Sequence, residues 1–246
     1  RDFRKILDNP KDEELFIDSK VLLSFNKRQN EDVSDVDVLK DPFTVLMLGN
    51  NEGLSDSIIL ASFNPQTLRL TMTSLSRDSY VPISCYPNGS RDKLNHSRAH
   101  SRQCIIDTVE DFLDVEVDFY FETDFYALVK IVDTLGGLEL DSPIEFSGSL
   151  PLEDSPGKYE QIKVEKGRSL MNGKQAITFA RERHHMPNGD FDRQLNQQYV
   201  IKELAQKILS TRNIETLMDV LDVAKDNIVM NIPVESISAL MGYSLE

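Results

Sequence analysis

Three apolar segments in the first third of the chain each have the length of a β-strand. Residues 43–49 (FTVLMLG) and 57–63 (SIILASF) are almost continuously apolar, as expected of strands that are buried on both faces. Residues 68–74 (LRLTMTS) alternate between apolar and polar side chains and follow the turn signal NPQT. The pattern therefore predicts a sheet in which the second and third strands form a hairpin.

Further along the chain, apolar residues recur with the period of a helix. Residues 103–113 place apolar side chains on one face, and residues 123–137 do the same before a Gly136–Gly137 stop. We also predict a strand at 117–121, polar or proline-containing loops at 92–102 and 142–160, and helices at 172–183, 190–209 (with Asp190 as N-cap), 213–225 and 233–243. Strands that alternate with helices predict an α/β fold, with helices on both faces of a sheet.

The overall charge is strongly acidic, because 41 Asp and Glu residues outnumber 27 Lys and Arg residues and give a net charge of −14. General nucleic-acid binders present a basic surface, so we expect no nucleic-acid partner. Seven of the thirteen arginines and all four histidines nevertheless fall in residues 77–102 and 178–193. Guanidinium groups suit phosphate oxygens, so these clusters indicate an anion site. A chance cluster on a solvated helix face is the other interpretation.

Two cysteines, Cys85 and Cys104, have eighteen residues between them. This spacing fits neither a zinc motif nor a C-x-x-C motif. The pair is either two buried thiols or one disulfide, and a disulfide closing such a loop would add on the order of 3 kcal/mol in an oxidising compartment. The residues alone leave both alternatives open.

No segment of the sequence reaches the roughly 20 apolar residues that span a bilayer. The sequence begins with Arg1 rather than Met, so we expect that a leading segment is missing from it. Residues 1–42 are rich in charge, and we interpret them as a peripheral extension. Residues 43–246 are expected to form one domain.

Several charged residues lie where a ligand would bind. Arg77 and Asp78 follow a predicted strand, and open α/β sheets tend to bind ligands at strand ends. Asp56 precedes the second strand and is a candidate Mg²⁺ ligand. Arg193 lies in the first turn of a predicted helix, where a cation opposes the helix dipole unless an anion binds beside it. The alternatives are a surface ion pair for Arg77 and Asp78 and a solvated turn for Asp56.

Other candidate residues have simpler explanations beside the functional one. Arg181 and Arg183 lie near the end of a predicted helix, where cations are favoured even without a ligand. Arg98 and Arg102 lie in the basic segment 92–102, and a solvated loop would explain them as well as an anion site.

The order of these motifs resembles that of the LytR–CpsA–Psr family of cell-envelope proteins over about residues 43–209. The motifs are SDSIILASFNPQTLRLTMTSLSRDSYVPI, DKLNH, VDFYFETDFYALVKIVDTLGGLEL, LMNGKQAITFARER and GDFDRQLNQQYVI. The resemblance implies a three-layer α/β/α sandwich with a mixed central sheet and a hydrophobic lipid-binding pocket. It implies a phosphotransferase that moves a glycopolymer, such as teichoic acid or capsule polysaccharide, from a polyprenyl-pyrophosphate carrier to peptidoglycan.

The resemblance also implies a location and partners. It places the domain at the extracytoplasmic face of the membrane of a Gram-positive-type bacterium, anchored through a segment outside this sequence. An oxidising location of this kind favours a disulfide between Cys85 and Cys104. The implied partners are a polyprenyl-pyrophosphate-linked glycan and a peptidoglycan acceptor, and the implied cofactor is Mg²⁺.

The resemblance assigns roles to individual residues. The implied catalytic residues are Arg77, Asp78, Arg181 and Arg193. The implied pyrophosphate-binding residues are Arg77, Arg98, Arg102, Arg181, Arg183, Arg193 and Gln197, and the implied metal ligands are Asp56 and Asp78. A cage of arginines would stabilise the negative charge that develops on the leaving phosphate.

The chain departs from the family pattern at a few positions. Asn51 stands where the family usually has Asp, while Leu54 and Asn196 stand where it commonly has Arg. The usual Gly-Gly after the N-H motif is replaced by Ser101 and Arg102. These changes remove an implied metal ligand and two positive groups. A non-catalytic module that binds the lipid pyrophosphate or the glycopolymer, and a pyrophosphatase, are therefore the alternative functions.

Overall fold

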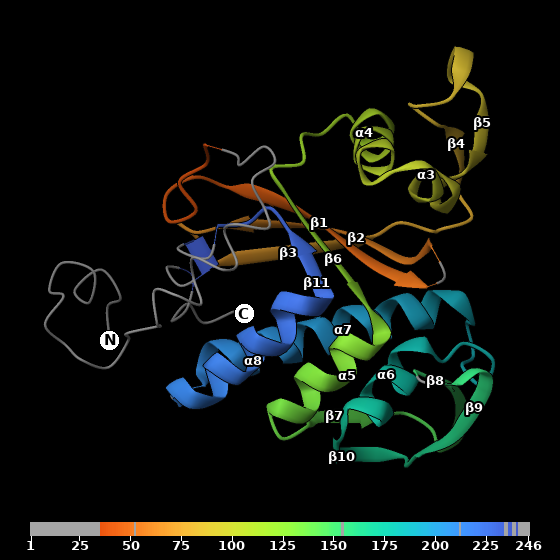
Figure 1. Cartoon of the computed structure of the whole chain (residues 1–246), viewed down its shortest axis with the longest axis vertical. Coiled ribbons are helices and arrows are strands. Elements are labelled where there is room, and N and C mark those ends of the chain that lie inside the picture. The colour runs from red at the N-terminus through yellow and green to blue at the C-terminus, as the bar shows by residue number, and fades with distance from the viewer. Residues whose placement is uncertain are drawn as a thin grey trace, which may run out of the picture. The chain divides into compact units, whose positions relative to one another are not determined.

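The computed structural model describes residues 35–51, 53–153, 155–211, 213–233, 236–237 and 240. They form two compact units (Figure 1). Unit 1 comprises the described residues up to Asp124 and those from Ile228 onward, and unit 2 spans Phe125–Asn227. Each unit has its own buried apolar clusters and is described by itself.

Unit 1 is built on a five-stranded sheet with the strand order β11-β6-β1-β2-β3. The strands β1 (Phe43–Asn51), β2 (Leu54–Asn64) and β3 (Arg69–Ser74) form an antiparallel meander. Strand β6 (Phe119–Asp124) runs parallel to β1, and β11 (Ile228–Met230) runs antiparallel to β6. The sheet is therefore mixed, and the predicted hairpin is confirmed.

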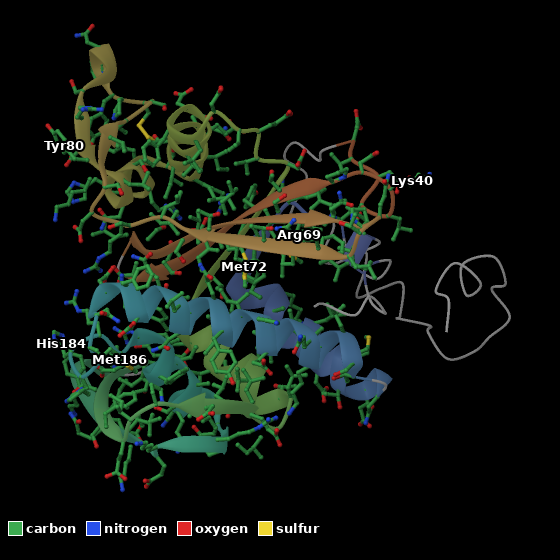
Figure 2. The ribbon with its side chains drawn as sticks, turned by 180° about the vertical axis from the view of Figure 1, so that it is seen from behind. Lys40, Arg69, Met72, Tyr80, His184 and Met186 are labelled. Atoms are coloured by element: carbon green, nitrogen blue, oxygen red, sulfur yellow. A yellow bond between two sulfur atoms is a disulfide. The ribbon has the colours of Figure 1, made fainter. Side chains whose placement is uncertain are left out.

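Helices α3 (Leu94–His100) and α4 (Arg102–Leu113) pack on one face of this sheet (Figure 1). Alternate residues of a strand share a face, and Arg69 and Met72 of β3 accordingly project from opposite faces (Figure 2). The helices and the sheet bury a common apolar cluster that includes Leu46, Leu48, Ile58, Leu94, Ile105 and Val109. Phe112, which the helical pattern predicts to be buried, is 44% exposed.

Residues 92–102 contain helix α3, where the sequence indicates a loop. A short hairpin of β4 (Tyr80–Pro82) and β5 (Arg91–Lys93), with the 3-10 turn η2 (Pro87–Gly89) between its strands, leads directly into α3. The backbone N–H groups of Leu94 and Asn95 donate to the carbonyl oxygens of Ser79 and Arg77 at 2.8 and 3.0 Å. These hydrogen bonds satisfy backbone N–H groups at the start of the helix that have no partner within it. They stabilise a helix whose sequence is largely polar.

A disulfide joins Cys85 to Cys104, with Cα atoms 5.4 Å apart (Figure 2). It starts just after β4 and ends in the first turn of α4, whose N-cap residue Ser101 accepts a hydrogen bond from the backbone N–H of Cys104 at 3.0 Å. Of the two alternatives for the cysteines, the disulfide is therefore confirmed. It closes the segment that carries Arg98 and Arg102 into a loop.

Unit 2 combines four described helices with two two-stranded sheets. The helices are α5 (Phe125–Thr134), α6 (Gly173–Arg181), α7 (Asp190–Ser210) and α8 (Ile214–Asn227). The sheets pair β7 (Leu138–Ser142) with β10 (Gly167–Met171), and β8 (Phe146–Leu152) with β9 (Ser155–Val164). The predicted helices at 123–137, 172–183, 190–209 and 213–225 are confirmed within a few residues at each end.

The hairpin of β8 and β9 occupies most of the segment for which the sequence indicates a loop. One proline and one glycine lie at irregular positions of the hairpin. Pro151 lies where the strand register shifts, and Gly157 adopts a positive φ of 80°. The buried positions of the two strands include Phe146, Leu150, Ile162 and Val164.

Helices α5 and α6 approach closely at Gly173. A Cβ atom at this position would lie 2.1 Å from the carbonyl oxygen of Val129, so no larger residue fits without moving a helix. The Asn172 side chain caps α6, and Gln175 completes a capping box. These contacts fix the start of the helix that ends with Arg181.

Helix α7 has Gly189 as its N-cap, so the expected cap Asp190 is the first helical residue. Gly189 has a φ of 56°, which favours glycine.

Val38, in the expected extension, is buried against Phe43, Phe63 and Phe119. Residues 1–34 and most of 233–243 lie outside the described residues, and the division at residues 42 and 43 stays a prediction. Over the residues that are described, no helix has the length and apolar character to cross a membrane.

Candidate functional site

The polar residues of unit 1 gather at one edge of its sheet. The parallel pairing of β1 with β6 ends at Asn50 and Asp124, and β2 starts at the same edge. Strand β3 runs antiparallel to β2 and also ends there. Open α/β sheets bind ligands at such strand ends. We call the following residues the sheet-edge cluster: Asn50, Asp56, Arg77, Asp78, Lys93, Arg98, Arg102 and Glu122.

Asp56 occupies a β-bulge at this edge. Gly49 pairs with Ser57 and Asn50 pairs with Ser55, so Asp56 is the extra residue of β2. A bulge changes the direction of a side chain and is common beside functional sites. The Asp56 carboxylate accepts a hydrogen bond from Nη1 of Arg77. The structure thus brings together two residues that lie 21 positions apart in the sequence.

Arg77 lies between two carboxylates. Besides its bond to Asp56, its Nε is 3.6 Å from Oδ2 of Asp78. Nζ of Lys93 donates to Oδ1 of Asp78 at 2.6 Å. The hydrogen bond from Lys93 is the main cause that lowers the pKa of Asp78 below its usual 3.8, and the charge of Arg77 adds to the effect. Asp78 is therefore ionised at neutral pH.

Glu122 is a buried carboxylate that binds two of the candidate arginines. Nε of Arg98 donates to Oε1 at 3.0 Å, and Nε of Arg102 donates to Oε2 at 2.6 Å. Nη2 of Arg98 and Nδ2 of Asn50 also donate to Oε1. Burial alone would raise the pKa of Glu122, but the hydrogen bonds from Arg98 and Arg102 outweigh burial and hold it below the usual 4.5.

Two neutral residues complete this arrangement. The guanidinium carbon of Arg102 lies 4.9 Å from the ring centroid of Tyr120, which shares a face of β6 with Glu122. The amide oxygen of Asn50 accepts a hydrogen bond from the Ser55 hydroxyl at 2.7 Å. Sequence reasoning missed Tyr120, Asn50 and Glu122. For Glu122, the available signal was an acidic residue directly after the strand predicted at 117–121 (VDFYF).

In unit 2, the candidate residues Arg181 and Arg183 flank a buried glutamate, Glu182. The guanidinium carbon of Arg181 lies 4.4 Å from the ring centroid of Phe125, while Arg183 is exposed. Glu182 accepts hydrogen bonds from the backbone N–H groups of His184 and His185 at 2.5 and 2.9 Å. Burial alone would raise its pKa, but hydrogen bonds from the backbone and ring of His185 and the backbone of His184 lower it below 4.5.

Helix α7 carries the remaining candidates. Arg193 is buried in its first turn, with Nη2 2.8 Å from Oδ1 of Asp190, and Gln197 is buried one turn later. Nδ2 of Asn196, where the family pattern has Arg, is 3.5 Å from the carbonyl oxygen of Phe179. The roles of these residues in pyrophosphate binding stay predictions.

The donor chemistry of unit 1 fits Mg²⁺ in a restricted way. Among the described residues, no group of three or more His, Cys, Asp or Glu side chains is arranged to hold a metal ion. Mg²⁺ is, however, commonly bound by one or two carboxylates together with substrate phosphates and water. Asp56 fits such a site as a carboxylate ligand, because it lies at the strand edge beside the phosphate-compatible Arg77.

The family model described as the LytR_cpsA_psr family matches residues 17–245. The chain belongs to this family. A relative from Bacillus licheniformis, named polyisoprenyl-teichoic acid–peptidoglycan teichoic acid transferase TagU, is 36% identical over 216 residues. The match covers 85% of this chain and 66% of the relative. The chain therefore spans slightly less than two thirds of the length of this curated relative.

Solved structures support the fold of this LytR_cpsA_psr chain. Protein gbs0355 from Streptococcus agalactiae aligns with a TM-score of 0.72 and 31% identity, over 85% of this chain and 76% of that one. The crystal structure of Bacillus subtilis TagU aligns with a TM-score of 0.64 and 33% identity, over 83% and 82%. The α/β fold with a mixed central sheet is thereby confirmed.

Proposed function

We propose that this chain transfers a glycopolymer from a polyprenyl-pyrophosphate carrier to peptidoglycan, with teichoic acid as the polymer class. The names of its relatives support the reaction. The observation that carries the proposal is the sheet-edge cluster, which gathers four cationic and three carboxylate side chains at a ligand-binding edge in a chain of net charge −14. A locally positive site in an acidic protein suits a pyrophosphate.

The proposed reaction is a substitution at phosphorus. A hydroxyl oxygen of a peptidoglycan sugar attacks the phosphorus that bears the glycopolymer, and the bond from this phosphorus to the bridging oxygen breaks. Polyprenyl monophosphate leaves, and negative charge develops on it. The guanidinium groups of Arg77, Arg98 and Arg102 stabilise this charge more strongly in the transition state than in the bound substrate.

We assign different roles to the two aspartates. Phosphoryl transfer requires mostly positioning and charge stabilisation, so the proton acceptor need not be a strong base. Asp78 stays ionised, and we propose that it accepts the hydrogen bond and then the proton of the attacking hydroxyl. Asp56 would hold Mg²⁺, which when bound supplies positive charge to the phosphate oxygens.

The arginines of unit 2 belong to the same proposal on different grounds. Arg181 and Arg193 match the family motifs A-R-x-R and G-D-x-x-R, and we propose that both take part in catalysis. Arg183 and Gln197 are proposed to bind the pyrophosphate on the same basis. We also propose an extracytoplasmic location, for which the disulfide between Cys85 and Cys104 is suited.

The test is a transfer assay with purified protein, polyprenyl-pyrophosphate-linked teichoic acid and peptidoglycan fragments, analysed by mass spectrometry. We expect a phosphodiester-linked conjugate and polyprenyl monophosphate with Mg²⁺, and loss of both products with EDTA. Free glycan phosphate without a conjugate would instead indicate a pyrophosphatase.

A binding module without turnover is the second candidate function. It is favoured by Leu54 and Asn196, which leave two positions without the positive charge that is common in the family. Fewer cations weaken the stabilisation of charge in the transition state more than they weaken lipid binding. Donor that remains bound and chemically intact in the transfer assay would support this function.

A further inference from the structure

Glu122 differs from the other carboxylates of the sheet-edge cluster in its burial. Its side chain is 7% exposed, while those of its partners Arg98 and Arg102 are 22% and 28% exposed. The carboxylate therefore lies beneath two guanidinium groups that still reach the solvent. A ligand that approaches this site meets the arginines before it meets Glu122.

The nitrogen atoms through which each arginine binds Glu122 determine which donors remain for a ligand. It binds Arg102 through Nε and Arg98 through Nε and Nη2. An arginine side chain has five N–H donors, and those on the Nη atoms are best placed to bind a phosphate side by side. Glu122 thus takes Nε of both arginines and Nη2 of Arg98, and the Tyr120 hydroxyl also hydrogen-bonds to the Arg102 side chain. Each guanidinium group still has Nη donors that Glu122 does not use.

The charge of this group also points to an anion. Two guanidinium groups held side by side repel each other, and one shared carboxylate reduces this repulsion. The group retains a net charge of +1, since two positive charges share one negative charge. The ring of Tyr120 lies against the guanidinium group of Arg102 and restricts its orientation further.

We propose that Glu122 is a positioning residue that holds Arg98 and Arg102 so that their outer Nη groups bind the oxygens of the pyrophosphate. This inference rests on the proposed function, because it specifies how unit 1 binds the donor substrate. Glu122 itself does not contact the substrate. Its effect on binding passes entirely through the two arginines.

The first test is the affinity of wild-type protein and Glu122→Gln for geranylgeranyl pyrophosphate, measured by isothermal titration calorimetry. Glutamine has nearly the same volume, but it has one acceptor oxygen and no charge, so it cannot hold both arginines. We expect the Kd of the variant to rise at least about tenfold, by analogy with the loss of metal affinity when a partner that orients a metal ligand is removed. In the transfer assay the donor KM should rise while the acceptor KM stays unchanged.

A matched control is available in unit 2. Glu139 forms an exposed ion pair with Arg168 at 2.6 Å, so Glu139→Gln makes the same chemical change beside an arginine. We expect its affinity for the probe to equal that of the wild type. An equal loss of affinity in both variants would contradict the inference.

A double-mutant cycle separates positioning from a general structural role. In a protein with Arg98→Gln and Arg102→Gln, the change Glu122→Gln should cause no further loss of probe affinity, because no arginine remains to be positioned. A further tenfold loss in this background would overturn the inference. Thermal melting of each variant shows whether it is folded before binding is measured.

If Glu122→Gln does not fold, Glu122→Asp replaces it. Aspartate keeps the charge but withdraws the carboxylate by one methylene group, so it cannot reach both arginines as Glu122 does. We expect the Kd for the probe to rise about fivefold or more, because the shorter side chain would misplace the two arginines by about 1 Å, and a displacement of this size weakens function strongly. An unchanged Kd in this folded variant would overturn the inference.

The outcomes distinguish this inference from the proposed function. If the wild type binds the probe but forms no conjugate, the proposed transfer fails, and the Kd of the variant still tests Glu122. If the wild type forms a conjugate and Glu122→Gln binds the probe as tightly, the inference fails and the transfer stands. A wild type that does not bind the probe contradicts both.

Discussion

Both units bury a glutamate beside candidate arginines, but the two glutamates bind different groups. Glu122 of unit 1 binds the side chains of Arg98 and Arg102. Glu182 of unit 2 binds the backbone N–H groups of His184 and His185 and the ring of His185. In both cases these donors lower the pKa of a carboxyl group that burial alone would raise.

The difference separates a binding role from a structural one. The donors that Glu122 holds belong to long cationic side chains with further N–H groups for a ligand. The backbone donors that Glu182 holds fix the chain just after helix α6, and they have no further donor to offer. We therefore expect substitution of unit 1 residues to affect substrate binding and turnover, and substitution of Glu182 to affect mainly stability.

The largest effect is expected for Arg77→Ala. Loss of a preorganised positive donor at the leaving phosphate should lower kcat about 10²- to 10³-fold. The transfer assay measures the change, and the fold is checked by thermal melting. Full turnover in this variant would remove Arg77 from the mechanism.

The disulfide tests whether unit 1 depends on its closed loop. Reduction of the bond between Cys85 and Cys104, or its replacement by serines, should lower the free energy of unfolding by about 3 kcal/mol. Because the loop carries Arg98 and Arg102, affinity for geranylgeranyl pyrophosphate should fall as well. Chemical denaturation and titration calorimetry measure the two effects, and unchanged stability after verified reduction contradicts the expectation.

Glu182→Gln is expected to reduce stability by a smaller amount. Weakening hydrogen bonds to a buried carboxylate costs about 2 kcal/mol, which corresponds to a fall in Tm of about 4–8 °C for a chain of this size. The Kd of the folded variant for the pyrophosphate probe should stay within twofold of the wild-type value, which corresponds to a change in binding free energy of at most about 0.4 kcal/mol. A large loss of affinity without a change in Tm would reverse the proposed difference between the two glutamates.

The smallest expected effect is on the way the stability of the protein changes with pH. Glu122 and Glu182 have pKa values below 4.5 in the folded state, so each stabilises the fold above its unfolded pKa of about 4.5. This contribution is lost as the pH falls through the lower folded value. Melting curves between about pH 3 and pH 7 should show a shallower loss of Tm for Glu182→Gln than for the wild type. Parallel curves would contradict the expectation.

The sequence predicts the meander of unit 1 and most helices because their patterns are local. Apolar runs identify β1 and β2, and the turn at 64–67 joins β2 to β3. The hairpin of β8 and β9 was predicted as a loop because prolines and glycines obscure its pattern. Their accommodation depends on the register shift at Pro151 and on the positive φ of Gly157 within β9, which local composition does not specify.

The candidate site is predictable residue by residue, but its pairings are not. Strand ends and charge identify Arg77 and Asp78. The contact of Arg77 with Asp56 depends on a register shift between two strands. Glu122 was missed because it directly follows the strand predicted at 117–121, and an acidic residue in such a place usually faces the solvent. Only the arginines of helices α3 and α4 make it a buried partner.

The central claim is that the sheet-edge cluster of unit 1 binds the pyrophosphate through arginines that Glu122 holds. A crystal structure of the protein with geranylgeranyl pyrophosphate tests this most directly. The account predicts phosphate oxygens within about 3.2 Å of Nη atoms of Arg98 and Arg102, with the Nε atoms of both arginines still bonded to Glu122. A pyrophosphate bound without contact to either arginine would contradict it.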